Sequence, residues 1–175
     1  MHYSELDTPC LIVDPAVVKS NIAEMVRMVG DVDRLRPHIK THKTAEGIQM
    51  MLHAGIQKFK CATIAEAELL AENGAKDVLL AYQPVGPKIQ RLFELCKRYP
   101  TTTFSCLTDH LDAASAIGAF FHQHQSSMDV YVDLNIGMNR TGILPDTTAV
   151  DLIENIVATS GITYKGLHEI GRAHV

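Results

Sequence analysis

Short apolar runs alternate with longer amphipathic stretches along most of the chain. The apolar runs have the length and composition of strands, and they lie at 10–13, 34–40, 58–62, 77–82, 101–107, 128–134 and 163–168. The amphipathic stretches carry apolar residues at helical spacing, and they lie at 14–29, 44–55, 63–74, 86–99, 109–124 and 147–161. Because the connections between strands are long enough for a crossover helix, the pattern predicts a parallel sheet.

Signals at the ends of several helices support these boundaries. Asp14 precedes Pro15 at the start of the first helix, and Gly30 follows its last apolar residue. Aspartate is a favoured N-cap, proline fits the first helical position, and glycine favours the left-handed conformation that ends a helix. Thr63 and Gly74 bound the third helix in a similar way.

The fold class that fits this pattern is α/β, as a partial (β/α)8 barrel of the TIM type. About six of the eight βα units of such a barrel follow the first strand and helix, and a closed barrel usually takes about 250 residues. An open doubly wound sheet is the alternative. No G-x-G-x-x-G segment follows any strand, so nothing favours a dinucleotide-binding fold.

Composition and charge exclude several classes of protein. The chain has 175 residues, 46% of them hydrophobic and 21% charged, with a net charge of −4. The mild acidity argues against nucleic acid or a membrane surface as partner, and no stretch approaches the roughly 20 apolar residues of a membrane span. The N-terminus lacks the features of a secretory signal. The four cysteines form no C-x-x-C pair, so we expect reduced thiols in a cytoplasmic protein.

The segment LRPHIKTHK, residues 35–43, is unusually basic for an acidic chain. Alternation along the predicted strand places Arg36, His38 and Lys40 on one face, with Lys40 at the carboxyl end, where barrels have their active sites. Three cations on one face need an anionic partner, either a phosphorylated cofactor or nearby carboxylates. A lysine in such surroundings has a lowered pKa, which suits Schiff-base chemistry. A solvated cluster paired with surface carboxylates is the alternative. His38 and His42 do not suggest a metal site, because their spacing brings ligands together only on a helix.

Two further candidates follow later strands. The segment DLNIGMNRTG, residues 133–142, contains glycines that permit close backbone approach, and its Arg140 offers fixed donors for a phenolate or carboxylate. His168 ends the last strand, where an imidazole can stack on a flat ring or shuttle protons. A surface loop arginine and a hydrogen-bonded strand-end histidine are the alternatives.

Five segments in this order resemble one known family. LDTPCLIVD, RPHIKTHKT, KFKCATIAEAELL, VDLNIGMNRTGI and GLH are similar to segments of the D-threonine aldolase and D-serine dehydratase group, which is related to the alanine racemase N-terminal domain. The resemblance covers about residues 6–168 and implies a pyridoxal 5'-phosphate (PLP) enzyme built on a barrel.

The resemblance also implies roles for individual residues. Lys40 matches the lysine that binds PLP covalently, and Lys43 is the competing choice, which strand phase disfavours. Arg140 is expected to contact the phenolic oxygen of PLP. Asp133 is expected to supply a charge near Arg140. Asn135 and His168 are assigned to the same cofactor site.

The resemblance predicts a lyase acting on D-amino acids that carry a β-hydroxyl. D-Threonine aldolase, which releases glycine and acetaldehyde, is the favoured activity. D-Serine dehydratase, an amino-acid racemase and a non-catalytic PLP carrier are the alternatives. The substrate is a small molecule, and the full-length protein is expected to be a homodimer.

The domain organisation follows from where the resemblance stops. Residues 1–168 are expected to form an incomplete PLP-binding barrel domain, and residues 169–175 a non-native tail, because EIGRAHV replaces an expected Tyr-Asp-Gly-His stretch. A C-terminal β domain, which carries divalent metal ligands in the family, is not expected in this chain. We therefore expect no metal ligands here and an inactive fragment.

Overall fold

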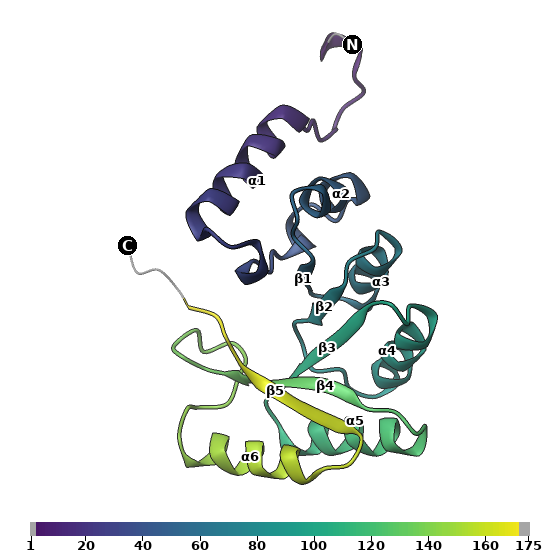
Figure 1. The fold of residues 1–175 in the computed structure, drawn as a ribbon, viewed down its shortest axis with the longest axis vertical. Coiled ribbons are helices and arrows are strands. Elements are labelled where there is room, and N and C mark those ends of the chain that lie inside the picture. The colour runs from purple at the N-terminus through teal and green to yellow at the C-terminus, as the bar shows by residue number, and fades with distance from the viewer. Residues whose placement is uncertain (1–2, 172–175) are drawn as a thin grey trace.

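A parallel sheet runs through the molecule in the computed structural model, which describes residues 3–171. Its five strands are hydrogen-bonded in the order in which they follow along the chain. They are β1 (Lys58–Cys61), β2 (Asp77–Leu80), β3 (Thr103–Thr108), β4 (Met128–Leu134) and β5 (Ile162–Glu169). A helix connects each strand to the next, as in Figure 1.

Helices account for most of the remaining structure. The α-helices are α1 (Pro15–Val29), α2 (Ala45–His53), α3 (Ile64–Glu72), α4 (Pro87–Arg98), α5 (Leu111–Gln123) and α6 (Thr147–Ala158). The short 3-10 helices are η1 (Tyr3–Glu5), η2 (Val32–Arg34) and η3 (Ile39–Thr41). Within residues 3–171 no helix is long and apolar enough to span a membrane.

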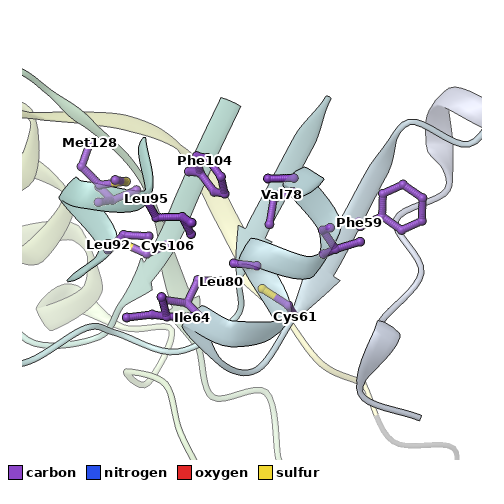
Figure 2. Close-up of a cluster of buried hydrophobic side chains, with 14 of the residues drawn as sticks. Phe59, Cys61, Ile64, Val78, Leu80, Leu92, Leu95, Phe104, Cys106 and Met128 are labelled. Carbon is purple, nitrogen blue, oxygen red and sulfur yellow. The ribbon is translucent and has the colours of Figure 1, made fainter. Parts of the chain in front are cut away.

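The hydrophobic core lies between one face of the sheet and the helices. Alternate residues of each strand point toward this side, so that Phe59, Val78, Phe104 and Val130 contribute to one continuous cluster. Figure 2 shows several of these side chains together with Leu92 of α4. The core thereby fixes which residues of each strand face the opposite side.

The other face of the sheet carries most of its polar residues. Lys60, Asp77, Ser105 and Asp133 alternate with the core residues of their strands. Sequential strand order is typical of a β/α barrel, whereas a doubly wound sheet reverses its order. The predicted α/β class with a parallel, partial barrel is therefore confirmed.

An irregularity in β5 changes the phase of that strand. Tyr164 pairs with Val130, but the next residue of β4, Tyr131, pairs with Gly166, so that Lys165 is an extra residue. Tyr164 packs on the helix-side core. After the bulge, His168 lies opposite Asp133 on the polar face. Without the extra residue, the alternation that turns Tyr164 toward the helices would continue along β5. His168 would then face the helices as well.

Two predicted strands are wrong. Residues 10–13 form no strand, and Leu11 is 85% exposed. This run has the composition of a strand but pairs with no other segment among the described residues. Apolar composition alone does not make a strand, because backbone N–H and C=O groups need a partner.

The predicted strand at 34–40 is reduced to one bridge. Lys60 N donates to Pro37 O over 2.9 Å, and His38 forms an isolated parallel bridge with Lys60. Proline has no N–H to donate, so it cannot extend the ladder. The chain then enters η3 at Ile39, so Lys40 lies in a 3-10 turn immediately after this extended segment rather than at a strand end. Strand β5 ends at Glu169, one residue beyond the prediction, and residues 172–175 of the predicted tail lie outside the described residues.

We predict that Gly118→Ala destabilises the protein. Glycine-to-alanine substitution in a helix usually stabilises by about 1 kcal/mol. Here a Cβ atom would lie 2.5 Å from Thr159 Cγ2 and 2.9 Å from the carbonyl oxygen of Ser160. We expect a net loss of about 1–3 kcal/mol from overpacking, measured as the free energy of unfolding in urea. Ser115→Ala, at an exposed position of the same helix, is the control; a gain in stability for Gly118→Ala would contradict the packing described here.

Candidate active site

Three side chains meet near the carboxyl ends of three strands, two of them adjacent and the third at the opposite edge of the sheet. Lys60 comes from β1, Asp133 from β4 and His168 from β5. His168 Nδ1 lies 2.6 Å from Asp133 Oδ1, and Lys60 Nζ lies 3.2 Å from His168 Nε2. The imidazole of His168 is thus held on both sides. In a parallel α/β barrel, this end of the strands is where active sites form.

Asp133 is a buried carboxylate that remains charged. Only 6% of the residue is exposed, and burial raises its pKa. Hydrogen bonds from His168 and Thr141 and the nearby charge of Lys60 outweigh burial, so the net effect lowers the pKa of Asp133. Asp133 thus places a negative charge at the pocket that Arg140 also lines, and its role toward Arg140 stays a prediction.

Lys60 was not singled out by the sequence, yet it lies at the centre of this cluster. Burial lowers the pKa of Lys60, and the positive charges of Lys40, Arg36 and Arg140 lower it further, while Asp133 raises it. A lysine with a lowered pKa among cations was expected on residues 35–43; Lys60, on β1, has these properties. The alternation of Lys58 and Lys60 with the core residues of KFKC was the available signal.

Lys40 lies beside this cluster with its side chain exposed. Its backbone N–H donates to His38 Nδ1 over 3.2 Å, and its charge acts on Lys60 and His38. Among the described residues, no ion pair or hydrogen bond engages Lys40 Nζ. Lys43 differs, because its Nζ forms an ion pair of 3.2 Å with the buried Glu66. Of these two lysines, Lys43 has a carboxylate partner and Lys40 has none among the described residues; the reactive lysine stays a prediction.

Arg36 is not part of this cluster. Its guanidinium forms two hydrogen bonds, of 2.6 and 2.8 Å, with the carboxylate of Asp77. Asp77 is the first residue of β2, so the pair lies at the amino ends of the strands. The sequence left open whether the basic residues pair with a phosphorylated cofactor or with a carboxylate. Arg36 pairs with a carboxylate.

The segment 135–142 forms a closed loop over the strand ends. Asn135 N donates to Ile143 O, and Ile143 N donates to Asp133 O, which joins the two ends of the loop. Asn135 Oδ1 accepts from the backbone N–H groups of Gly137 and Asn139. The amide oxygen of Asn135 therefore holds the loop together, and its cofactor contact stays a prediction.

Asp109 anchors the same loop from a neighbouring strand end. Its Oδ2 accepts from Gly142 N over 2.8 Å. Gly142 has φ of +97°, and a Cβ there would lie 2.5 Å from Asn135 N, so only glycine fits. Nothing in the sequence pattern marked Asp109 as part of the site. Its contact becomes visible only when β3 and β4 lie side by side.

Arg140 points from this loop toward a small pocket. The lining includes apolar residues such as Leu107 and Ile170 and several polar or aromatic side chains: Tyr82, Gln83, Thr108, Asp133, Arg140 and His168. Among the described residues, no carboxylate forms an ion pair with Arg140. The structure thus brings Asp133, Arg140 and His168 together at one pocket. Lys40 does not line this pocket, but it lies close enough for its charge to act on Lys60.

The cysteines take no part in this site. All four are free. Burial raises the pKa of Cys61 and of Cys96 to about 12, and it raises the pKa of Cys106 as well. These three thiols are protonated near neutral pH and are poor nucleophiles.

Comparison with known proteins agrees with this arrangement. Residues 13–171 match the family described as the alanine racemase N-terminal domain. The chain belongs to this family. The match includes every strand of the sheet and all the side chains that surround the pocket.

Several relatives of the chain have known activities. The chain is 31% identical to a 3-hydroxy-D-aspartate aldolase of Paracoccus denitrificans (strain Pd 1222), over 95% of this chain and 43% of the relative. It is 30% identical to a D-threo-3-hydroxyaspartate dehydratase of Delftia sp. (strain HT23), over 82% of this chain and 37% of the relative. A crystal structure of D-threonine aldolase from Filomicrobium marinum superposes with a TM-score of 0.85 at 29% identity, over 94% of this chain and 44% of that one. The chain therefore spans less than half the length of these relatives.

We predict that His38 makes stability fall between about pH 6.5 and pH 4. Burial and the charges of Lys40 and Lys60 lower the pKa of His38 from 6.5 to about 4. In that window the unfolded chain binds a proton that the folded chain does not, so stability decreases as the pH falls. His38→Gln should reduce the difference in unfolding free energy between about pH 7 and about pH 5. His53→Gln, at an exposed position of α2, is the control; equal pH dependence in His38→Gln and the parent chain would contradict the proposed burial.

Proposed function

We propose that this chain is the N-terminal part of a PLP-dependent lyase that acts on D-amino acids with a β-hydroxyl. Within this class we propose the retro-aldol cleavage of D-threonine to glycine and acetaldehyde. The observation that carries the proposal is the meeting of Asp133, Arg140 and His168 at one pocket beside Lys40, in a chain of this family. An aldolase and a dehydratase of D-hydroxy amino acids among the relatives support the substrate class.

The residues at the pocket, together with Lys40 beside it, fit the chemistry of PLP. The cofactor has an aldehyde, a phenolic oxygen, an aromatic ring and a phosphate. Lys40 provides an amine with no partner among the described residues, and Arg140 provides a guanidinium free of carboxylates there. His168 provides a flat imidazole that is held in place on both sides.

Each residue then has a task that its own chemistry supports. Lys40 would hold the cofactor through its amine and could exchange protons there, because an amine can act as nucleophile and as base. Arg140 keeps its positive charge and stabilises a phenolate. Asp133 holds the imidazole of His168, and Asp109 holds the loop that carries Arg140. When bound, PLP supplies the electron sink that lets a bond at the substrate Cα break.

Two activities remain to be separated by experiment. Retro-aldol cleavage of D-threonine breaks its Cα–Cβ bond, whereas dehydration of D-serine breaks its Cβ–oxygen bond and gives pyruvate and ammonia. The dehydratase is the second candidate, supported by the relative from Delftia. Product analysis with D-threonine and D-serine distinguishes them: glycine with acetaldehyde supports the aldolase, and a 2-oxo acid with ammonia supports the dehydratase. Formation of the L-isomer would instead identify a racemase, and no turnover a PLP carrier.

We also propose that the intact protein continues beyond the barrel part in residues 1–168. The coverage of relatives, below one half, supports a second region of comparable length. A C-terminal β domain there would carry the ligands of a divalent metal. The described residues contain no group of three or more His, Cys, Asp or Glu side chains that could hold one. We propose a homodimer as the active form.

The lysine that binds PLP gives a direct test on the intact protein. We predict that Lys40→Ala abolishes the visible absorbance of bound PLP, because the neighbouring amines of Lys43 and Lys60 are engaged by Glu66 and His168. Lys43→Ala should keep the band, since Lys43 pairs with Glu66 instead. Borohydride reduction followed by peptide mapping should place the pyridoxyl mass on Lys40. A label on Lys43 or Lys60, or no label, would contradict the proposal.

A further inference from the structure

We propose that Lys60 is a positioning residue that fixes the proton arrangement of His168. The geometry assigns the His168 ring proton to Nδ1 and makes Nε2 a hydrogen-bond acceptor from Lys60 Nζ. His168 is then a neutral ring that lines the pocket in a fixed orientation, and it does not shuttle protons. The role of the His168 ring in catalysis rests on the proposed function, but the proton arrangement does not.

The first step of the argument is Asp133. Its carboxylate is buried and charged, so both of its oxygens are acceptors only. His168 Nδ1 lies 2.6 Å from Asp133 Oδ1, which requires a proton between the two atoms. Because the carboxylate has none, the proton belongs to Nδ1.

The second step concerns the other nitrogen of the ring. A neutral imidazole has one N–H, and Nδ1 has already been assigned it. Nε2 therefore carries a lone pair, and it lies 3.2 Å from Lys60 Nζ. The lysine can donate to this lone pair, whereas a doubly protonated ring would bring two donors together. The order of donors along the chain is Lys60, then His168, then Asp133.

The third step is that Lys60 cannot easily take another partner. It is the third residue of β1, and its backbone N–H is bound to Pro37 O, so the direction of its side chain is set by the strand. The charged groups that act on Lys60 are Lys40, Arg36, Arg140 and Asp133. Three of these are cations that repel it, and Asp133 lies on the far side of the imidazole.

This arrangement has a consequence for the chemistry of the pocket. Both ring nitrogens of His168 are engaged by protein groups, so neither is available to accept a substrate proton. Under the proposed function, that task falls to another group, for which Lys40 is the candidate from this chain. Lys60 acts through His168 and has no catalytic role of its own.

The test is nitrogen NMR of the intact protein with histidine rings labelled with 15N, without added PLP. His168→Gln identifies the His168 signals by their loss. The parent protein should show a protonated Nδ1 and an unprotonated Nε2 that accepts a hydrogen bond. In Lys60→Met, which keeps most of the stem but removes the donor, we expect the Nε2 signal to shift away from its parent position. Lys60→Arg should restore that position.

Lys58→Met is the matched control for these variants. Lys58 precedes Lys60 by two residues on the same face of β1, and its Nζ donates to Asp33 O instead of His168. We expect the His168 signals of Lys58→Met to match those of the parent protein. A shift of equal size in both variants would overturn the proposal, because it would reflect a general disturbance of the strand.

Failure of this inference is distinguishable from failure of the proposed function. A protonated Nε2 in the parent protein at neutral pH would overturn the inference without any variant. A protein that binds PLP through Lys40 but shows unchanged His168 signals in Lys60→Met would also overturn it. A protein with the expected signals and no PLP binding would support the inference and contradict the proposed function.

Discussion

One extra residue in β5 decides what the candidate site contains. Before Lys165, the even-numbered residues of β5 pair with the apolar, helix-facing residues of β4. After Lys165, the even-numbered residues pair with β4 residues that face the opposite side. His168 therefore lies opposite Asp133 rather than among core side chains. The imidazole would otherwise face the helices, where a polar ring has no partner and burial is costly. Gly166, with φ of +140°, permits the irregularity because its backbone conformation is one that side chains disfavour.

The separation of the two sheet faces makes this position chemically useful. On one face, Phe59, Val130 and their neighbours bury apolar surface against the helices and hold the strands in register. On the other face, the strand ends bring a carboxylate, an imidazole and an ammonium group within hydrogen-bond distance. A charged Asp133 at this depth is stable because its hydrogen bonds outweigh the cost of burial.

The parts of the fold that follow from local pattern could be predicted, and those that depend on pairing could not. Helix caps such as Asp14 and Thr63 act within a few residues, and both cap the helices expected. The runs at 10–13 and 34–40 have the composition of strands, but a strand also requires hydrogen bonds to a neighbouring strand. Among the described residues, the first run pairs with no strand, and the second forms a single bridge.

The candidate site was predictable to a similar extent. Asp133, Arg140 and His168 follow strands, and parallel strands bring their carboxyl ends to one edge, so their meeting could be expected. Lys60 was missed because it lies inside a short strand, and its role depends on His168, which is 108 positions away in the chain. The bulge that turns His168 toward it is a property of strand pairing that a single glycine does not reveal.

The most direct test of the role of the bulge is a double-mutant comparison at Gly166. Gly166→Val should destabilise the protein by about 1–3 kcal/mol, because valine is strained at positive φ. Space is not the obstacle, since a Cβ there would lie 3.8 Å from the nearest ring atom of Tyr131. With Lys165 deleted, β5 can pair regularly, and the same substitution should cost little or nothing when unfolding free energies are compared. An equal cost in both backgrounds would contradict the claim that the extra residue sets the conformation of Gly166 and the direction of His168.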